Sequence, residues 1–147
     1  SVHLVGGKDC CLKECWTKRS ADDIYKEYLE KVYKSVNADY PWQIAGHLGY
    51  PERYAPKTER DLAFENYSRE LTDILKSIVA KGKFLEINSS TKSEKPFMPS
   101  EEILEKYVAF GGKYVTFGSD AHSVERYCEN ASEVGKTIKK YGLISVG

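Results

Sequence analysis

The sequence alternates short apolar runs with longer stretches of helical periodicity, and this alternation limits the folds open to the chain. The apolar runs cover residues 2–5, 43–48, 83–87, 113–117 and 143–146. Each is short and rich in β-branched, aromatic or leucine residues, which is typical of a strand buried on both faces. Strand–helix alternation repeated four times predicts parallel strands joined by right-handed crossovers. An open doubly wound α/β sheet and part of a β/α barrel both satisfy this pattern.

Four helices are expected between these runs from their apolar spacing and their end signals. The first follows Ser20, which forms a motif with Asp23 that resembles a capping box. A second is expected from about residue 58 to residue 80, and a third begins at Ser100 and stops at a pair of glycines. Ser123 is expected to cap a fourth helix.

Charge and targeting signals exclude some classes of function. The 22 basic and 22 acidic residues cancel, which disfavours a strongly electrostatic nucleic-acid binder, although a local basic patch stays open. The sequence contains neither a transmembrane run nor a signal peptide at its start, so we expect a cytoplasmic protein without membrane partners. Function therefore has to be inferred from individual sites.

Four cysteines stand at positions 10, 11, 15 and 128. Their even number permits two disulfides, and the cluster near the start is a candidate for a zinc site. That cluster lacks the paired C-x-x-C spacing of common structural zinc sites, however, and the chain is not a small cysteine-dense secreted frame. We therefore expect reduced thiols that bind no metal.

The three histidines all lie in or next to predicted strands. His3 is inside the first run, His47 is near the end of the second, and His122 comes just after the fourth. Sites in parallel α/β architectures are built at the carboxyl ends of the strands. His47 and His122 are expected there directly, and His3 can reach the same face from inside a barrel.

Asp120 and His122 are two residues apart, after an apolar run. In an extended segment their side chains point to the same face, where a carboxylate and an imidazole can bind neighbouring divalent metals. Small residues around them let an ion or a substrate approach closely. The alternative is a solvated Asp-x-His turn before a helix capped by Ser123. The histidines on other strands favour the metal site.

Glu86 is an acid inside an otherwise apolar run, where an unpaired carboxylate is costly. We favour a role in orienting a ligand histidine or a loop over an exposed position at a barrel rim. Arg53, in the loop after the second run, can present a planar fork to a phosphate. Most loop arginines are simply solvated, so phosphate binding is the minority hypothesis here, and Lys92 and Lys95 have weaker grounds.

Four segments resemble motifs of the PHP-domain histidinol phosphatases, in the order of that family. Residues 1–5 resemble its "S-V-H" strand, and residues 46–54 resemble "G-H-L-D-Y…R-Y". Residues 86–90 are similar to "E-I-N-T-S", and residues 118–123 match "G-S-D-A-H-S". The segments span essentially the whole chain, and the last is the most specific.

The resemblance implies a distorted (β/α)7 TIM-like barrel with up to three divalent metals, zinc, iron or manganese. It implies hydrolysis of histidinol phosphate, in histidine biosynthesis, by a metal-bound hydroxide. By motif, His3 and His47 would bind one metal, Asp120 a second and His122 a third. Asp120 and His122 are thereby the expected catalytic residues, and the substrate contacts are expected at Arg53, Asn88 and Lys92.

The chain also departs from the family. The H-x-H motif near the family's amino terminus is absent, so we expect residues 1–147 to be a single partial PHP domain, the C-terminal part of a barrel whose N-terminal part is missing. Gly49 replaces the usual acid after "G-H-L", and Ser93 stands near the family's basic residue. The alternatives are a PHP phosphoesterase with another substrate, or an inert fragment or assembly module. Unpaired sheet edges would favour a homo-oligomer.

Overall fold

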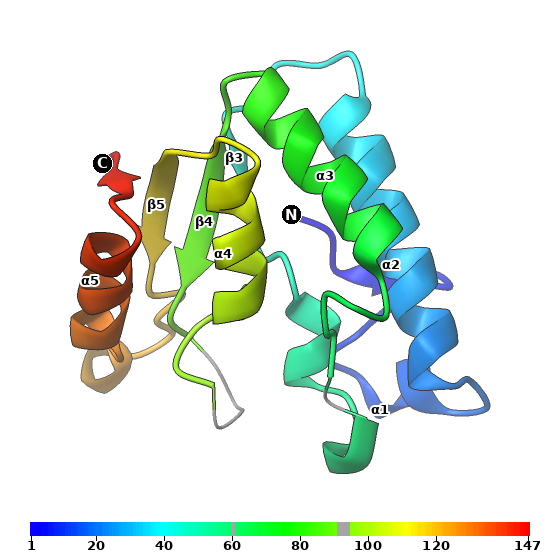
Figure 1. Ribbon diagram of the computed structural model, residues 1–147. Coiled ribbons are helices and arrows are strands. Elements are labelled where there is room, and N and C mark those ends of the chain that lie inside the picture. The colour runs from blue at the N-terminus through cyan, green and yellow to red at the C-terminus, as the bar shows by residue number, and fades with distance from the viewer. Residues whose placement is uncertain (60, 91–94) are drawn as a thin grey trace.

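A parallel sheet organises the computed structural model, which describes residues 1–59, 61–90 and 95–147. Over these residues its strands are β3 (Ile44–Ala45), β4 (Phe84–Asn88), β5 (Tyr114–Gly118) and β6 (Ile144–Ser145), and their spatial order follows the chain (Figure 1). All three neighbouring pairs are parallel. The prediction of an α/β fold with a parallel sheet is confirmed for the last four apolar runs.

The first apolar run does not join this sheet, and its prediction as a parallel strand was wrong. Instead, β1 (Leu4–Val5) pairs with β2 (Lys8–Asp9) as an antiparallel hairpin. The turn consists of Gly6 and Gly7, with φ of 58° and 75°. Two consecutive left-handed residues form the tight turn that suits a two-residue hairpin, and glycine adopts that conformation without steric cost. His3 therefore precedes a hairpin.

Five α-helices are found in the described residues. They are α1 (Lys13–Trp16), α2 (Ala21–Asn37), α3 (Ser68–Ala80), α4 (Glu101–Ala109) and α5 (Ala131–Lys140). Short 3₁₀ helices lie at η1 (Tyr50–Arg53), η2 (Lys57–Glu59) and η3 (Val124–Arg126). The predicted cap of α2 is confirmed, because the hydroxyl of Ser20 accepts a hydrogen bond from the Asp23 N–H at 3.1 Å.

The second predicted helix begins ten residues later than expected, at Ser68 rather than near residue 58. Acidic side chains from other elements hold the backbone N–H groups of this segment. The N–H of Leu62 donates to the Glu52 carboxylate at 3.3 Å, and the N–H of Phe64 donates to Glu102 at 3.1 Å. Leu62 is fully buried, so an apolar residue that seemed part of the helix belongs to a folded loop.

The last helix also starts late, and the prediction that Ser123 caps it was wrong. Ser123 precedes only the 3₁₀ turn η3, and α5 begins at Ala131. Between them, Cys128 and Asn130 have φ of 61° and 55°. Left-handed residues cannot continue a right-handed helix, so the periodicity that crosses this segment does not form one.

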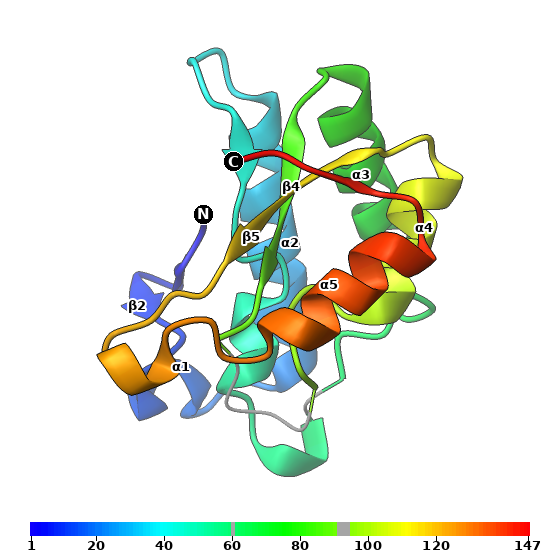
Figure 2. The same ribbon diagram turned by 90° about the vertical axis from the view of Figure 1, so that its left-hand side faces the viewer.

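The sheet has one face covered by helices. Figure 2 shows α3, α4 and α5 on one side of the strands and the amino-terminal segment with β2 on the other. Leu85, Ile87 and Val115 are fully buried in the core. Alternate residues point to the opposite face. There, one row across the sheet contains Ile44, Phe84, Tyr114 and Ile144, and three of these are 44–49% exposed.

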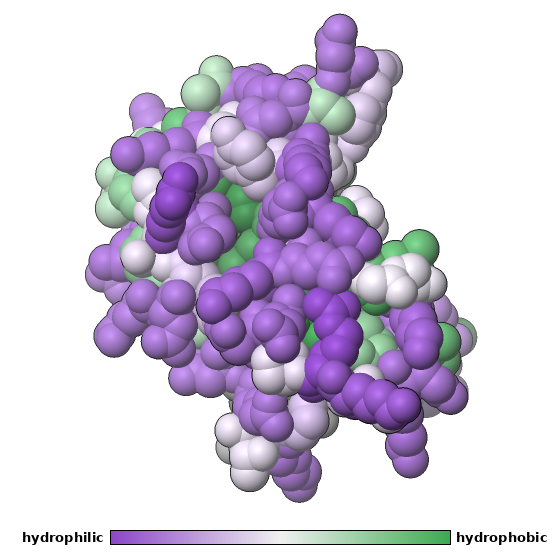
Figure 3. Space-filling model, turned by 90° about the vertical axis from the view of Figure 1, so that its right-hand side faces the viewer, coloured by the Kyte–Doolittle hydropathy of each residue, from purple (hydrophilic) through white to green (hydrophobic). Residues whose placement is uncertain are grey.

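The outer surface of the helices is mostly polar. Figure 3 looks onto the side of α2 and α3 and shows a largely hydrophilic surface with small hydrophobic areas. None of the described helices combines the length and the apolar composition that crossing a lipid bilayer requires. The four cysteines form no disulfide with one another, and the sulfur atoms of the buried pair Cys10 and Cys15 lie 3.8 Å apart.

Candidate functional site

The centre of the site is the Glu86 carboxylate, which occupies a slot between two glycines. Glu86 lies in the middle of β4, and its neighbours are Gly46, just after β3, and Gly118, at the end of β5. A Cβ at Gly118 would lie 2.3 Å from Oε1 of Glu86, and a Cβ at Gly46 would lie 3.2 Å from Oε2. The absence of side chains at both positions therefore makes room for this carboxylate.

His47 is held beside Glu86 in an unusual backbone conformation. Its N–H donates to Oε2 of Glu86 at 2.8 Å, and its Nδ1 lies 3.3 Å from the same oxygen. Its φ is 61°, in the left-handed region. The hydroxyl of Tyr28, a buried residue of α2, donates to the His47 carbonyl at 2.7 Å and accepts from the Gly49 N–H at 3.2 Å. Such strain persists where surrounding contacts fix it, commonly at functional sites.

His47 and Glu86 shift each other's titration. The hydrogen bond to Glu86 raises the pKa of His47 above its ordinary value, although burial acts in the opposite direction. Burial alone would raise the pKa of Glu86, but its bonds to His47 and the histidine charge outweigh this and lower it. Both effects favour the charged forms of the two groups.

Asp120 follows β5 and connects three other side chains. Its Oδ2 lies 3.6 Å from Nε2 of His47 and accepts from Nη1 of Arg53 at 3.2 Å. Its Oδ1 lies 3.5 Å from Nε2 of His122, whose side chain is 82% exposed. Burial alone would raise the pKa of Asp120, but the Arg53 hydrogen bond and the charges of His47 and Arg53 lower it.

The expectation that Asp120 and His122 share a face in an extended segment was wrong in its geometry. The φ of Asp120 is 46°, in the left-handed region rather than the extended one. The two side chains still approach each other, because the turn at Asp120 brings them together. Asp120 and His47 thus both adopt a backbone conformation that is rare for residues with a side chain.

Arg53 is buried, not solvated like most loop arginines. Its side chain is 6% exposed, and η1 places it directly after the His47 loop. Besides Asp120, it donates from Nη2 to the hydroxyl of Ser90 at 2.8 Å. Its Nε is buried and has no hydrogen-bond partner within residues 1–59, 61–90 and 95–147. A buried guanidinium with an unused donor is suited to bind an additional acceptor.

His3 lies beside His47 although it is outside the parallel sheet. Its ring stacks on Tyr50 at 4.3 Å between centroids, and its centroid is 5.1 Å from that of His47. Burial and the nearby His47 charge lower the pKa of His3, which favours its neutral form. Its Nε2 is buried and unpartnered among the described atoms. A neutral imidazole with an unused nitrogen can act as a metal ligand.

The other residues that were predicted to contact the substrate do not all lie at the site. Asn88 is fully buried, its Nδ2 donates to Glu86 at 3.3 Å, and its Oδ1 accepts from the Ser90 N–H at 2.9 Å. It therefore supports the loop beneath Arg53 in this structure. Lys92 lies outside the described residues. Lys95 contacts the carboxylate of Glu52.

Sequence reasoning missed three residues that the structure adds to the site. Ser90 links the arginine to the sheet, and Tyr28 fixes the His47 loop. Arg126 donates from Nη2 to Ser90 at 3.3 Å. Ser90 stands inside a segment that resembled a family motif, so a signal existed for it. Arg126 and Tyr28 fall within the helices predicted after Ser123 and Ser20, which gave no reason to place either at the site.

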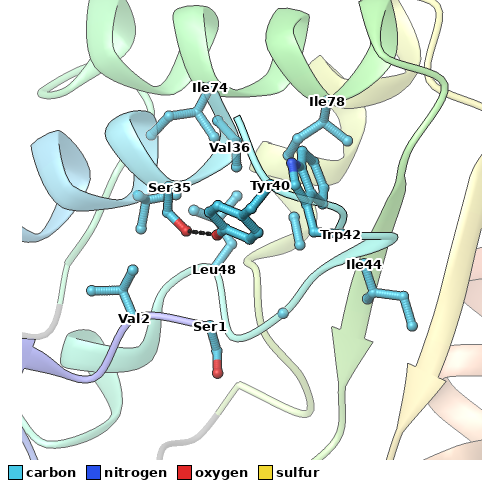
Figure 4. Close-up of a pocket in the computed structure, with 13 residues that line it drawn as sticks. Ser1, Val2, Ser35, Val36, Tyr40, Trp42, Ile44, Leu48, Ile74 and Ile78 are labelled. Atoms are coloured by element: carbon cyan, nitrogen blue, oxygen red, sulfur yellow. Dashed lines mark hydrogen bonds between the residues drawn. The ribbon is translucent and has the colours of Figure 1, made fainter. Parts of the chain in front are cut away.

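An apolar cavity is separate from this polar cluster. It has a volume of about 150 Å³ and lies between α2, α3 and the free edge of β3. Figure 4 shows Val36, Tyr40, Trp42, Ile74 and Ile78 around it, with a hydrogen bond between Ser35 and Tyr40. It contains no ionisable ligand group. The side chains that could bind a metal or a phosphate therefore lie in the cluster at the carboxyl ends of the strands.

The donor types of the cluster fit a divalent metal such as zinc, which binds imidazole nitrogen and carboxylate oxygen. The unpartnered Nε2 of buried His3 fits the same purpose. Within the described part of the chain, however, no three His, Cys, Asp or Glu side chains converge closely enough to hold an ion. In this arrangement Asp120 is engaged by Arg53 instead. The donor types therefore fit a metal, but their arrangement in the described residues does not form a complete site.

Comparisons with known proteins point to one family. No family model matches the chain. The histidinol-phosphatase of Lactococcus lactis subsp. lactis is 29% identical over 97% of this chain, and a probable histidinol-phosphatase of Thermotoga maritima is 35% identical over 83%. A probable histidinol-phosphatase of Clostridium acetobutylicum is 27% identical over 83%. The chain spans 54%, 50% and 48% of their lengths, which is about half of each.

A solved structure agrees in fold. The crystal structure of histidinol phosphate phosphatase from Lactococcus lactis, complexed with zinc, L-histidinol and phosphate, matches 99% of this chain with a TM-score of 0.85 and 27% identity. The match covers 56% of that protein. In both sequence and fold this chain is thus similar to histidinol-phosphatases, and it spans about half the length of these relatives.

Proposed function

We propose that this chain carries part of the active site of a phosphate-monoester hydrolase that acts on histidinol phosphate. The observation that carries the proposal is the convergence of His47, Glu86, Asp120 and Arg53, which come from β4 and from the segments that follow β3 and β5. The ligands named for the Lactococcus lactis structure, zinc, histidinol and phosphate, support the same chemistry.

We infer the following roles for the metal-facing residues. His3, His47, Asp120 and His122 are the part of the metal ligand set that this chain supplies. Zinc, the ion named for the Lactococcus lactis structure, is the first candidate, and iron and manganese are the alternatives. Such an ion, when bound, supplies positive charge that neutralises the phosphoryl group and activates water for its hydrolysis. Glu86 positions His47 through its backbone N–H and its ring.

The substrate phosphate is assigned to the side of the cluster where Arg53 lies. The guanidinium of Arg53 is a planar donor that matches a phosphate, and Ser90 and Asp120 already hold it in one orientation. Preorganisation of this kind lowers the entropy cost of binding. Asn88 supports Ser90, so its contribution to substrate binding is indirect.

Zinc binding by the purified chain tests the ligand assignment separately from activity. We expect Asp120→Ala to lose zinc in equilibrium dialysis, and Glu86→Gln to weaken zinc binding roughly 10–100-fold, as is usual when a group that orients a ligand is removed. Asp73→Ala, on the exposed surface of α3, is the matched control. Retention of zinc by Asp120→Ala, together with no hydrolysis of histidinol phosphate by the zinc-loaded protein, would refute the proposal.

The fold supports a more specific proposal, namely that the chain is a partial domain, the C-terminal part of a distorted (β/α)7 PHP barrel. Its strands follow one another in chain order, and helices cover one face only. A barrel closed by further strands would cover the opposite face. The half-length match to relatives agrees with this.

An assembly role is the second candidate, and the exposed apolar row Ile44, Phe84, Tyr114 and Ile144 favours it. Apolar residues in a continuous exposed row commonly mark an interaction surface. We infer that a second copy of the chain covers this row. Light scattering after size-exclusion chromatography should then detect a dimer whose fraction rises with concentration, whereas a monomer at every concentration would exclude this role.

A further inference from the structure

A second guanidinium lies next to the one already described. Arg126, at the end of η3, places its Nη2 3.3 Å from the hydroxyl oxygen of Ser90. The same oxygen accepts from Nη2 of Arg53 at 2.8 Å. Ser90 is only 1% exposed, so two cationic side chains from different segments meet at one buried neutral hydroxyl.

Each of the two guanidiniums has an acidic partner of its own, and neither partner is shared. Arg53 has Asp120 as its acidic partner, and Arg126 has Glu129 at 2.9 Å. Among the residues that the structure describes, no carboxylate forms an ion pair with both guanidiniums. Like charges in a partly buried place repel each other, and a shared anion removes that repulsion. The buried, unpartnered Nε of Arg53 is a second sign that an acceptor belongs here.

The position of the pair agrees with binding of a ligand. Arg53, Ser90 and Arg126 follow β3, β4 and β5 respectively, so all three stand at the carboxyl edge of the sheet, where parallel α/β folds bind their ligands. Asp120 lies between the arginine and His47. Arg126 is 34% exposed at its side chain, so an anion can reach it from solvent.

We propose that Arg126 is a second phosphate-binding residue, which with Arg53 and Ser90 selects a phosphate-monoester dianion. This deepens the proposed function and rests on it for the identity of the substrate, but the anion site itself does not depend on hydrolysis. Two guanidinium forks on one phosphate provide charge and geometry together, which a single buried arginine does not.

A substitution at Glu129 distinguishes phosphate binding by Arg126 from a purely local role of Arg126. If Arg126 only pairs with Glu129 within its own turn, changing Glu129 has no effect on anion binding. If Arg126 binds phosphate, Glu129 competes with it for the guanidinium. Glu129→Gln should then tighten phosphate binding, because the competing charge is gone.

Inorganic phosphate is the probe, titrated into the full chain in metal-chelated buffer and followed by ¹H–¹⁵N NMR shifts. We expect Arg126→Ala to weaken binding roughly tenfold or more, since a hydrogen bond to a charged group is lost, and Arg126→Lys to give an intermediate value. Arg19→Ala is the matched control, because Arg19 is similarly exposed at 31% and pairs with Glu27 elsewhere on the molecule. Its affinity should equal that of the wild type.

Equal phosphate affinity in Arg126→Ala and the wild type would overturn the proposal, as would a wild-type chain that shows no phosphate-dependent shifts. Unchanged affinity in Glu129→Gln would also count against it. Hydrolysis of histidinol phosphate is measured separately. Arg126-dependent phosphate binding refutes the proposed function alone when Asp120→Ala retains zinc and the zinc-loaded chain does not hydrolyse histidinol phosphate. Hydrolysis with an unchanged KM in Arg126→Ala refutes this inference alone.

Discussion

Replacing Gly118 by alanine places a methyl group against the carboxylate that organises the site. The new Cβ would lie 2.3 Å from Oε1 and 3.1 Å from Cδ of Glu86. Since non-bonded atoms settle at about 3.5 Å, the carboxylate must move by roughly 1 Å. Such a shift stretches the 2.8 Å hydrogen bond from the His47 N–H and the 3.3 Å bond from Asn88.

The cost can be estimated from these contacts. Inserting a methyl group into filled space costs about 1–3 kcal/mol, and losing a hydrogen bond to a charged group costs about 1.5–3 kcal/mol. Because the carboxylate keeps part of its bonding, we expect Gly118→Ala to lower the free energy of unfolding by about 3 kcal/mol. For a chain of 147 residues this corresponds to a Tm lower by about 6–12 °C.

Urea unfolding followed by circular dichroism measures this loss directly. The control is Gly135→Ala within α5, where a Cβ has no heavy atom within 4 Å and where alanine should stabilise the helix by about 0.5–1 kcal/mol. In a Glu86→Ala background, Gly118→Ala should cost much less, because its clash partner is gone. If Gly118→Ala unfolds like the wild type, or costs as much without Glu86, the slot does not exist as described.

Two further predictions concern the support of the site and of the hairpin. Tyr28→Phe removes the hydroxyl that donates to the His47 carbonyl and accepts from the Gly49 N–H, and it should cost about 1–3 kcal/mol in thermal unfolding, whereas Tyr33→Phe, exposed on the same helix, should cost little. Equal losses in the two variants would contradict this role of the Tyr28 hydroxyl. The hydrogen bond from the Gly6 N–H lowers the pKa of Glu27 from 4.5 to about 2, so its stabilising contribution is complete above pH 4.5 and is lost as the pH falls towards 2. Glu27→Gln should therefore be less stable than the wild type at neutral pH, with the gap closing through that acid range in urea unfolding, and a constant gap would disprove the linkage.

The sheet was largely predictable because its strands are short apolar runs separated by helices. Four of the five runs became parallel neighbours, and parallel pairing alone brings their carboxyl ends together. That is why His47, Asp120 and Glu86, far apart in the chain, could be assigned to one site before any geometry was known.

The errors came from backbone conformations that periodicity does not describe. Two left-handed glycines turned the first run into a hairpin, and left-handed Cys128 and Asn130 delayed the last helix. Arg126 approaches Ser90 from the segment before α5, so the prediction of a helix starting at Ser123 did not reveal this contact. Gly118 was expected to admit a substrate, but it admits the Glu86 side chain instead.

The sequential strand order has a consequence for how the chain can evolve and fold. Because β3, β4, β5 and β6 each pair with the next strand along the chain, every unit contacts mainly its neighbours, as in repeat proteins. A strand with its helix can then be gained or lost at either edge without changing the order or pairing of the remaining strands. Pairing can also proceed stepwise from any adjacent pair, but each step closes a long loop between parallel strands, which makes folding slow.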